Sequence, residues 1–151
     1  MTIKRAANGR AIRKNIKNAK QRGEWAEAQF MARAAGYGMG VSKPWGDSSR
    51  YDFVVETEDG FLRVQVKSTI CKEKNSYACT VHPNLGSRPY AKGELDFIAA
   101  YVIPEDIWYI IPAAKVVNGK MGLISLAPSI PGHKYERYME AWDLMRAKRR
   151  R

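Results

Sequence analysis

Residues 51–70 constrain the fold of this chain more than any other segment. Residues 51–56 and 61–70 are both rich in β-branched and aromatic residues, and the turn sequence 57–60 between them ends in Asp-Gly. Asp-Gly between two such stretches is a strong hairpin signal. In the second stretch apolar residues occupy every other position, as in a strand with one buried face; they are Leu62, Val64 and Val66. The segment therefore predicts an antiparallel hairpin.

Helical patterns lie on both sides of this hairpin. The first is predicted from about residue 15 to residue 35, where a Gly-Tyr-Gly cluster at 36–38 ends it, and the second spans residues 134–148. The apolar stripe expected on the first helix consists of Trp25, Ala28, Phe30, Met31, Ala34 and Ala35. The stripe expected on the second consists of Tyr135, Tyr138, Met139, Trp142 and Met145.

Further strands are predicted between the two helices. They are residues 76–81, 97–103 and 107–111, with another hairpin at 116–126 around Asn118 and Gly119. Residues 38–50 are expected to be a loop or short strand, and residues 81–92 a loop. The order of elements indicates an α/β (α+β) fold with a mixed β-sheet core flanked by helices.

Charge is the main compositional signal. The chain has 26 Lys and Arg against 15 Asp and Glu, a net charge of +11. Residues 1–23 contain eight basic side chains and no acid, and five of the last six residues are basic. Such a distribution favours a polyanionic partner. A solubilising tail or an acidic membrane surface is the alternative, although residues 1–22 offer few of the bulky apolar residues that a membrane-surface helix needs.

Length and hydropathy set the domain organisation. At 151 residues the chain fits one domain, predicted at 23–151, preceded by a basic arm at 1–22 that includes the start of the first helix. No stretch approaches the roughly 20 apolar residues that span a bilayer. The basic N-terminus has no apolar core of a secretory signal, so we expect a cytoplasmic protein. Cys71 and Cys79 lack metal-site spacing and are read as free cysteines, at least one of them buried.

Three polar residues in the predicted hairpin indicate a metal-binding catalytic site. Asp52 opens the first strand, and Gln65 and Lys67, two positions apart on the second, project to the same face. Asp52, Gln65 and the backbone carbonyl of Val66 offer the oxygen ligands that Mg²⁺ prefers. Lys67 can hold or help to deprotonate an attacking water and stabilise charge on a phosphate. A structural Asp–Lys pair across a hairpin explains the same residues equally well.

A wider sequence pattern favours a catalytic metal site over a structural Asp–Lys pair. Its pieces are Arg-Gly-Glu-Trp-Ala-Glu at 22–27, Gly-Tyr at 36–37, Pro-Trp-Gly-Asp-Ser-Ser-Arg-Tyr-Asp at 44–52 and Arg-Val-Gln-Val-Lys-Ser at 63–68. Together they resemble the PD-(D/E)XK nuclease superfamily. They are most similar to the group I intron-associated homing endonucleases, whose (D/E)XK motif carries Gln at the acidic position. The resemblance continues more loosely through residues 93–112.

The resemblance implies roles for individual residues within a restriction-endonuclease-like fold. Asp52 matches the metal-binding Asp, Gln65 the second metal-site position and Lys67 the catalytic Lys. Tyr51 stands where the superfamily name has Pro. The acid of the early helix falls best on Glu27, with Glu24 as the competitor; the two share a helix face. Because Gln65 is neutral, we expect activity to depend more strongly on Asp52 and Glu27.

Several residues near this constellation are candidates for DNA contacts. Lys43, Trp45, Ser48, Ser49 and Arg50 precede Asp52, Ser68 follows Lys67, and Arg88, Tyr90 and Lys92 lie in the 81–92 segment. Such side chains and their backbone amides can hold phosphates or reach a groove. Taken singly, each is more readily explained as a solvated charge or a packing aromatic.

These features together predict a metal-dependent endonuclease, with Mg²⁺ or Mn²⁺ as cofactor, that hydrolyses double-stranded DNA. The resemblance implies a site-specific, intron-homing enzyme, and the small size of the chain implies a homo-oligomer, a dimer or tetramer. A Holliday-junction resolvase or restriction-like nuclease with the same site is one alternative. A DNA-binding module that keeps the fold but does not cut is another.

Overall fold

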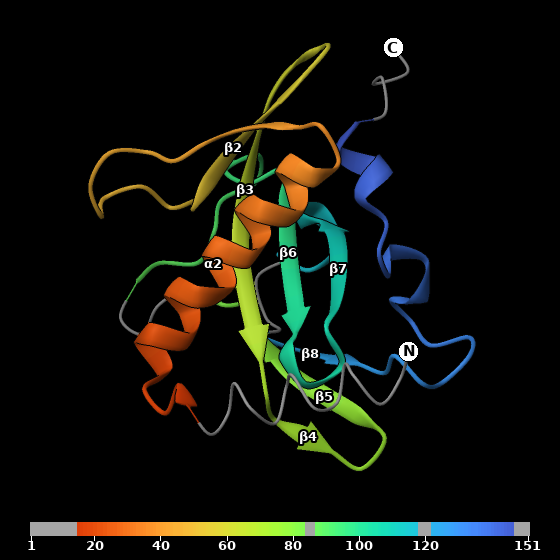
Figure 1. Cartoon of the computed structure of the whole chain (residues 1–151). Helices are drawn as coiled ribbons and strands as arrows, with labels where there is room; N and C mark the ends of the chain where they lie inside the picture. The colour runs from red at the N-terminus through yellow and green to blue at the C-terminus, as the bar shows by residue number, and fades with distance from the viewer. Residues whose placement is uncertain (1–14, 84–86, 118–121, 147–151) are drawn as a thin grey trace.

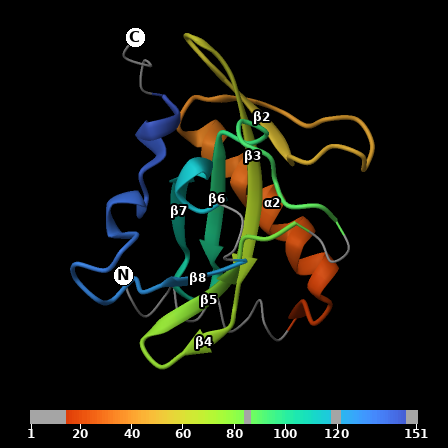
Figure 2. The ribbon, with the colours of Figure 1, turned by 180° about the vertical axis from the view of Figure 1, so that it is seen from behind.

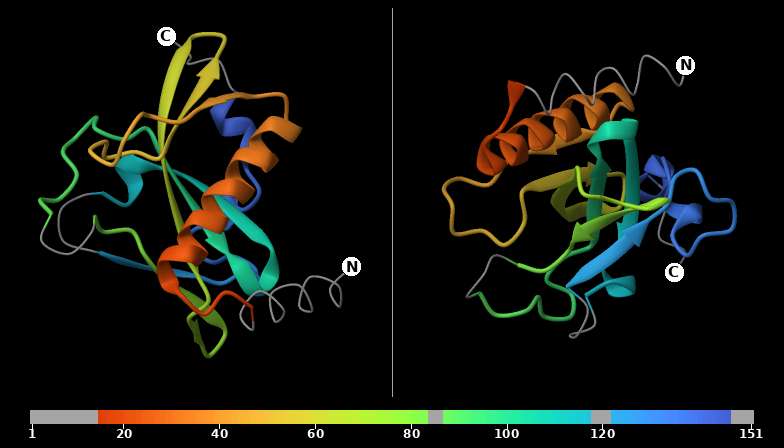
Figure 3. Two further views of the ribbon diagram at one scale, coloured as in Figure 1. Left: turned by 60° about the vertical axis from the view of Figure 1, so that its left-hand side comes forward. Right: turned by 90° about the horizontal axis from the view of Figure 1, so that it is seen from below.

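A long helix lies across one face of a five-stranded sheet, and a smaller sheet lies at one end of the main sheet (Figure 1), where its side chains pack with the other face of β6 and β7. The computed structural model describes residues 15–83, 87–117 and 122–146. The first helix, α2, spans Ala19–Gly36, and seen from below it runs along the main sheet (Figure 3). The predicted mixture of helix and sheet is therefore present.

Helix α2 begins where a side chain can satisfy its first backbone amides. The Oδ1 atom of Asn18 accepts hydrogen bonds from the backbone N–H groups of Lys20 (2.8 Å) and Gln21 (3.3 Å). The helix therefore starts later than the predicted residue 15. Its buried residues repeat every four positions, at Ala26, Phe30 and Ala34. The predicted stripe was too wide, because Ala28, Met31 and Ala35 are exposed.

The main sheet contains strands β1 (Gly40–Ser42), β2 (Phe53–Thr57), β3 (Gly60–Thr69), β6 (Phe97–Val102) and β7 (Ile107–Pro112), in the order β1-β2-β3-β6-β7. Strands β3 and β6 are parallel, and the other neighbours are antiparallel. The predicted hairpin is β2–β3, with Thr57 paired to Gly60 across its tight turn. Alternate residues of β3 are buried, as the sequence pattern predicts.

The second sheet lies at one end of the first, and Figure 2 shows it from behind. It contains β4 (Lys72–Glu73), β5 (Ser76–Thr80) and β8 (Leu123–Leu126), in the order β4-β5-β8. The hairpin predicted within 116–126 is absent from its described part: residues 116–117, just after the 3-10 turn η2 (Ala113–Lys115), form no strand, and β8 pairs with β5 instead. Asn118 and Gly119, the proposed turn, lie outside the described residues.

Strands β6 and β7 are apolar on both faces because each face meets a different core. Ala99 and Tyr101 point into the cluster beneath α2, whereas Ile98, Ala100 and Val102 point into a second cluster with side chains of β5 and β8. Their continuous apolar runs follow from burial on both sides. The chain passes between the two strands through η1 (Ile103–Glu105) and Asp106, which has a left-handed backbone conformation.

The predicted second helix at 134–148 is wrong within its described part. The chain there forms two 3-10 turns, η3 (Glu136–Tyr138) and η4 (Trp142–Met145), separated by an extended Met139 and by Glu140 at φ 52°. The cause is long-range bonding to Trp108. The Glu140 N–H donates to the Trp108 carbonyl (2.7 Å), and Glu140 Oε1 accepts from the Trp108 N–H (2.9 Å). The predicted apolar anchors Tyr135, Tyr138, Trp142 and Met145 are nevertheless buried.

The cysteines and the hydropathy of the helix agree with the sequence-based expectations. Both cysteines are free, Cys79 buried and Cys71 exposed, as expected. Among the described residues, no helix has both the length and the apolar character required to cross a bilayer.

Candidate active site

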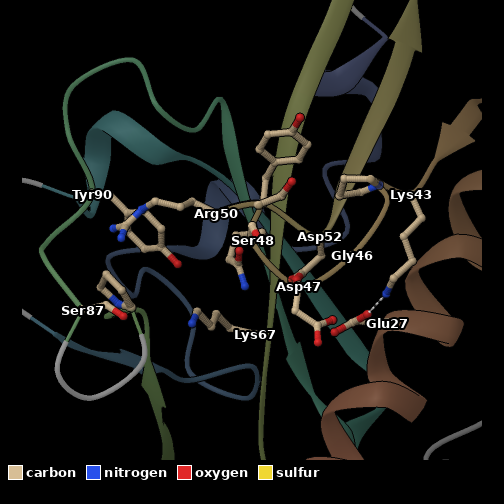
Figure 4. A pocket seen from close by; sticks show the side chains of 15 residues that line it. Glu27, Lys43, Gly46, Asp47, Ser48, Arg50, Asp52, Lys67, Ser87 and Tyr90 are labelled. Atoms are coloured by element: carbon tan, nitrogen blue, oxygen red, sulfur yellow. Dashed lines mark hydrogen bonds and ion pairs between the residues drawn. The ribbon is translucent and has the colours of Figure 1, made fainter.

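A pocket of about 400 Å³ opens where the base of the β2–β3 hairpin meets α2 and two loops (Figure 4). One loop leads from β1 to β2, and the other follows β5. Polar side chains dominate the lining, which consists of Glu27, Lys43, Pro44, Gly46, Asp47, Ser48, Ser49, Arg50, Tyr51, Asp52, Gln65, Lys67, Pro83, Ser87 and Tyr90. All the side chains that the sequence suggested for the chemical site itself therefore face one pocket.

Asp52 is fixed by the start of the hairpin. Its backbone N–H donates to the Val64 carbonyl (2.9 Å), and its Oδ2 accepts from the Val66 N–H (2.7 Å). The strand register, with Phe53 opposite Val64, sets Asp52 beside Gln65. Burial raises the pKa of Asp52 to about 6, and the Glu27 carboxylate adds to this effect. The bond from Val66 and the charge of Lys67 oppose the rise.

Lys67 shares the pocket-facing side of β3 with Gln65. Its Nζ donates a hydrogen bond to the His82 carbonyl (3.0 Å). Burial lowers the pKa of Lys67, whereas the neighbouring Asp52 acts in the opposite direction. The alternating strand sends Val64 and Val66 to the opposite face, where they are buried. The predicted common face of Gln65 and Lys67 is therefore present.

Glu27 enters the pocket from α2. It forms an ion pair with Lys43, and this contact raises the pKa of Lys43 (Figure 4). Glu24, the competing acid of the same helix, is exposed and does not line the pocket. The geometry thus distinguishes the two acids: only Glu27 faces Asp52.

The opposite side of the pocket is formed by Arg50 and Tyr90. The Arg50 guanidinium lies 4.9 Å from the centroid of the Tyr90 ring, and its Nη2 donates to the Arg88 carbonyl (2.6 Å). Its Nε lies 2.9 Å from Glu94 Oε1. Tyr90 is buried, and burial raises its pKa to about 12, so the phenol stays protonated at neutral pH.

Some predicted DNA contacts lie outside the pocket. Trp45 belongs to the β1–β2 loop but points fully into solvent. Ser68 is on the face of β3 away from Lys67, Arg88 is exposed on the rim, and exposed Lys92 lines a different hollow. Lys43, Ser48, Ser49, Arg50 and Tyr90 do line the pocket.

Sequence reasoning missed four contributions. Asp47 and Ser87 line the pocket, the His82 carbonyl binds Lys67, and Glu94 binds Arg50 and Arg88. Asp47 lies within the motif at 44–52, so a signal for it was available. The other three depend on how the chain folds after β5, and no local pattern marks them.

The oxygen donors fit a hard divalent cation. Within the described ranges, no group of three or more His, Cys, Asp or Glu is placed to hold a metal. The pocket instead offers the carboxylates of Asp52 and Glu27, with that of Asp47 also in the lining, and the neutral amide of Gln65. Mg²⁺ and Mn²⁺ accept such sparse oxygen ligation and keep several waters. The raised pKa of Asp52, which Glu27 helps to cause, fits two carboxylates that a cation would stabilise in their ionised forms.

Comparison with known proteins agrees with this geometry. Residues 17–145 match the family model described as PD-(D/E)XK endonuclease. The structure is similar to that of a bacterial homing endonuclease, I-Ssp6803I, with 31% sequence identity and a TM-score of 0.70 over 85% of this chain and 91% of that chain. No match was found among curated proteins. The similarity confirms the predicted restriction-endonuclease-like mixed fold.

Proposed function

Because the chain belongs to the PD-(D/E)XK endonuclease family, we propose that it cuts double-stranded DNA at specific sites with the help of a divalent cation. Membership of this family makes the chain an endonuclease. We propose in addition that its substrate is duplex DNA, that it needs a divalent cation and that it is site-specific. The observation that carries it is the convergence of Glu27, Asp52 and Lys67 on one pocket, although they come from helix α2, the end of the β1–β2 loop and strand β3.

The cation is assigned to the inner wall of this pocket. The carboxylates of Asp52 and Glu27 supply its charged ligands, and the Gln65 amide and the Val66 carbonyl supply neutral ones. Mg²⁺ or Mn²⁺ bound there provides positive charge for the phosphate and lowers the pKa of water. Lys43 now pairs with Glu27, so cation binding would free Lys43 to contact a phosphate.

Lys67 has the position and the environment of the reactive amine. It lies between Asp52 and the His82 carbonyl, and its burial favours the neutral form. A neutral Lys67 can accept the proton of a water that attacks phosphorus in line with the leaving oxygen. In its charged form, Lys67 can instead donate a hydrogen bond to the phosphate as negative charge develops.

The loop between β1 and β2 supplies the proposed DNA surface. Lys43, Ser48, Ser49 and Arg50 line the pocket with donors suited to phosphate oxygens. Exposed Trp45 extends this surface beyond the pocket, and Arg88 and Lys92 add positive charge beside it. Ser68, on the other face of β3, is not part of the proposed surface.

The similarity to a homing endonuclease supports the proposed site specificity, and the size of the chain supports the proposed assembly. I-Ssp6803I is described as a homing endonuclease. An intron-homing role for this chain implies a long target, and a chain of 151 residues has a limited footprint on DNA. We therefore propose a dimer or tetramer that places pockets on both strands.

The test is cleavage of a supercoiled plasmid library that carries random target sites, in Mg²⁺ and in EDTA. Wild-type protein should give linear product only with metal. Asp52→Ala should abolish cleavage and keep DNA binding, whereas Asp143→Ala, an exposed acid of η4, should leave both unchanged. Cleavage in EDTA would refute the metal requirement. DNA binding with no library member cut would instead identify a non-catalytic binding module.

A further inference from the structure

Glu94 lies behind one wall of the pocket and binds two arginines at once. Its Oε1 is 2.9 Å from Arg50 Nε and 2.8 Å from Arg88 Nη2. Its Oε2 accepts from Arg88 Nη1 (3.1 Å) and from the Ala91 N–H (2.8 Å). A single carboxylate thus ties the β1–β2 loop to the segment 87–94, and neither the sequence motifs nor the metal site accounts for it.

Arg50 and Arg88 differ in how firmly they are held. The Arg50 side chain is 23% exposed, lines the pocket and lies against Tyr90, whereas the Arg88 side chain is 60% exposed and lies on the rim. Among the described residues, Arg50 contacts Arg88, Tyr90 and Glu94, which all belong to the segment 87–94. The Arg88 contact is made by a neutral backbone carbonyl, whereas Glu94 contributes a carboxylate that forms an ion pair with Arg50 Nε, so Glu94 is the strongest electrostatic determinant of the guanidinium position.

We propose that Glu94 is a positioning residue that holds Arg50 at the pocket wall, ready for a phosphate of the DNA. The proposal rests on the DNA endonuclease function argued above. Arg88 can exchange Glu94 for a phosphate when DNA arrives, because it is exposed. Arg50 stays beside Tyr90 and Glu94, so its guanidinium enters the enzyme–DNA complex already oriented.

The negative charge of Glu94 allows a positioning role to be distinguished from a purely electrostatic or a purely structural role. A carboxylate facing DNA repels phosphates, so removing its charge should strengthen binding if charge were its only contribution. A purely structural residue would, when replaced, weaken folding, binding and cleavage together. A positioning residue predicts a third pattern, in which binding is kept or strengthened and the cleavage step is slowed.

The experiment compares Glu94→Gln with Glu73→Gln, an exposed acid of β4 on the second sheet that changes the net charge equally. DNA affinity is measured in EDTA at several salt concentrations, and kcat and KM are measured separately on a plasmid that wild type cuts. For Glu94→Gln we expect unchanged or tighter binding and a kcat about 10- to 100-fold lower, as for a misplaced group. Glu73→Gln should retain the wild-type kcat.

A double-mutant cycle connects the effect to Arg50. Arg50→Ala should lower kcat similarly, and Arg50→Ala combined with Glu94→Gln should lower it little further, because both changes remove the same oriented group. If Glu94→Gln lowers the melting temperature by more than a few degrees, the fold itself is affected, and Arg50→Lys is used to test the proposal instead. It leaves the bonds from Arg88 and Ala91 to Glu94 in place, and it should lower kcat at wild-type affinity.

Three results would overturn the proposal: wild-type kcat in Glu94→Gln, parallel losses of binding and cleavage in a folded Glu94→Gln, or additive effects of the two changes. For Arg50→Lys, a wild-type kcat would do so as well. Wild-type protein that cuts nothing in the same assay would instead refute the proposed function, so the two failures are distinguishable.

Discussion

The two faces of β3 differ sharply although their residues alternate along one strand. Val64 and Val66 pack into the core beneath α2, beside Phe30 and Phe53. Lys67, a neighbour of Val66 in the chain, points the other way into a polar pocket. One strand therefore both stabilises the fold and presents reactive groups, because its pleat separates the two environments.

The difference is also energetic. On the core face, apolar side chains leave water and stabilise the folded state. In the pocket, burial lowers the pKa of Lys67 on β3 and raises the pKa of the neighbouring Asp52, which means that their charged forms are less favourable than in water. We therefore expect the core face to supply stability that offsets the cost of the pocket face.

The largest expected effect is the loss of stability when a side chain that packs on the core face is removed. Phe30→Ala removes a fully buried ring that contacts Phe53, Trp108 and Trp142, and should lower the free energy of unfolding by about 3–5 kcal/mol. Met31→Ala, at the adjacent exposed position of α2, should cost less than about 1 kcal/mol. Urea titration measures both changes. Similar losses in the two variants would contradict the assigned core face of α2.

In the pocket, removing the charge of Asp52 should instead raise the free energy of unfolding. The folded pKa of Asp52, about 6, lies above the unfolded value of 3.8, so the folded state binds the proton more tightly. As pH rises from about 4 to about 6, wild-type protein in EDTA should therefore lose up to about 3 kcal/mol relative to Asp52→Asn. Unfolding free energies of both proteins across this range test it. A difference that stays constant or grows in favour of wild type would show that the pocket does not disfavour the charge.

The smallest expected effect lies beyond the pocket. Trp45→Ala should weaken DNA binding about tenfold, as expected for loss of one aromatic contact to DNA, and leave the unfolding free energy unchanged, since the ring is fully exposed. Phe61→Ala, another exposed aromatic at the far end of the hairpin, is the control and should bind normally. Fluorescence anisotropy of labelled duplex DNA measures both. Equal weakening by the two variants would remove Trp45 from the proposed DNA surface.

Sequence reasoning succeeded where the determining contacts are local. The hairpin β2–β3 follows from its Asp-Gly turn and its alternating apolar residues, and the shared face of Gln65 and Lys67 follows from the pleat. Once the hairpin is set, Asp52 must lie beside Gln65. The position of Glu27 came instead from the resemblance, because nothing local distinguishes it from Glu24.

Sequence reasoning failed where distant parts of the chain decide the conformation. The spacing of Tyr138, Trp142 and Met145 suits a helix, yet the bonds between Glu140 and Trp108 divide the segment into two short turns. Likewise β8 pairs with β5, a partner far earlier in the chain. The bond from Lys67 to the His82 carbonyl has the same long-range origin.

The most direct test of a reactive pocket face on β3 is a paired measurement on Lys67→Met, which keeps most of the length of the side chain and removes its charge. We measure the unfolding free energy and the rate of Mg²⁺-dependent DNA cleavage on the same preparations. We expect stability equal to wild type within about 1 kcal/mol, or higher, because a charge no longer needs to be buried. Cleavage should fall at least about a hundredfold, the scale of a lost acid–base group. Cleavage at the wild-type rate would show that the pocket face of β3 is not the reactive one.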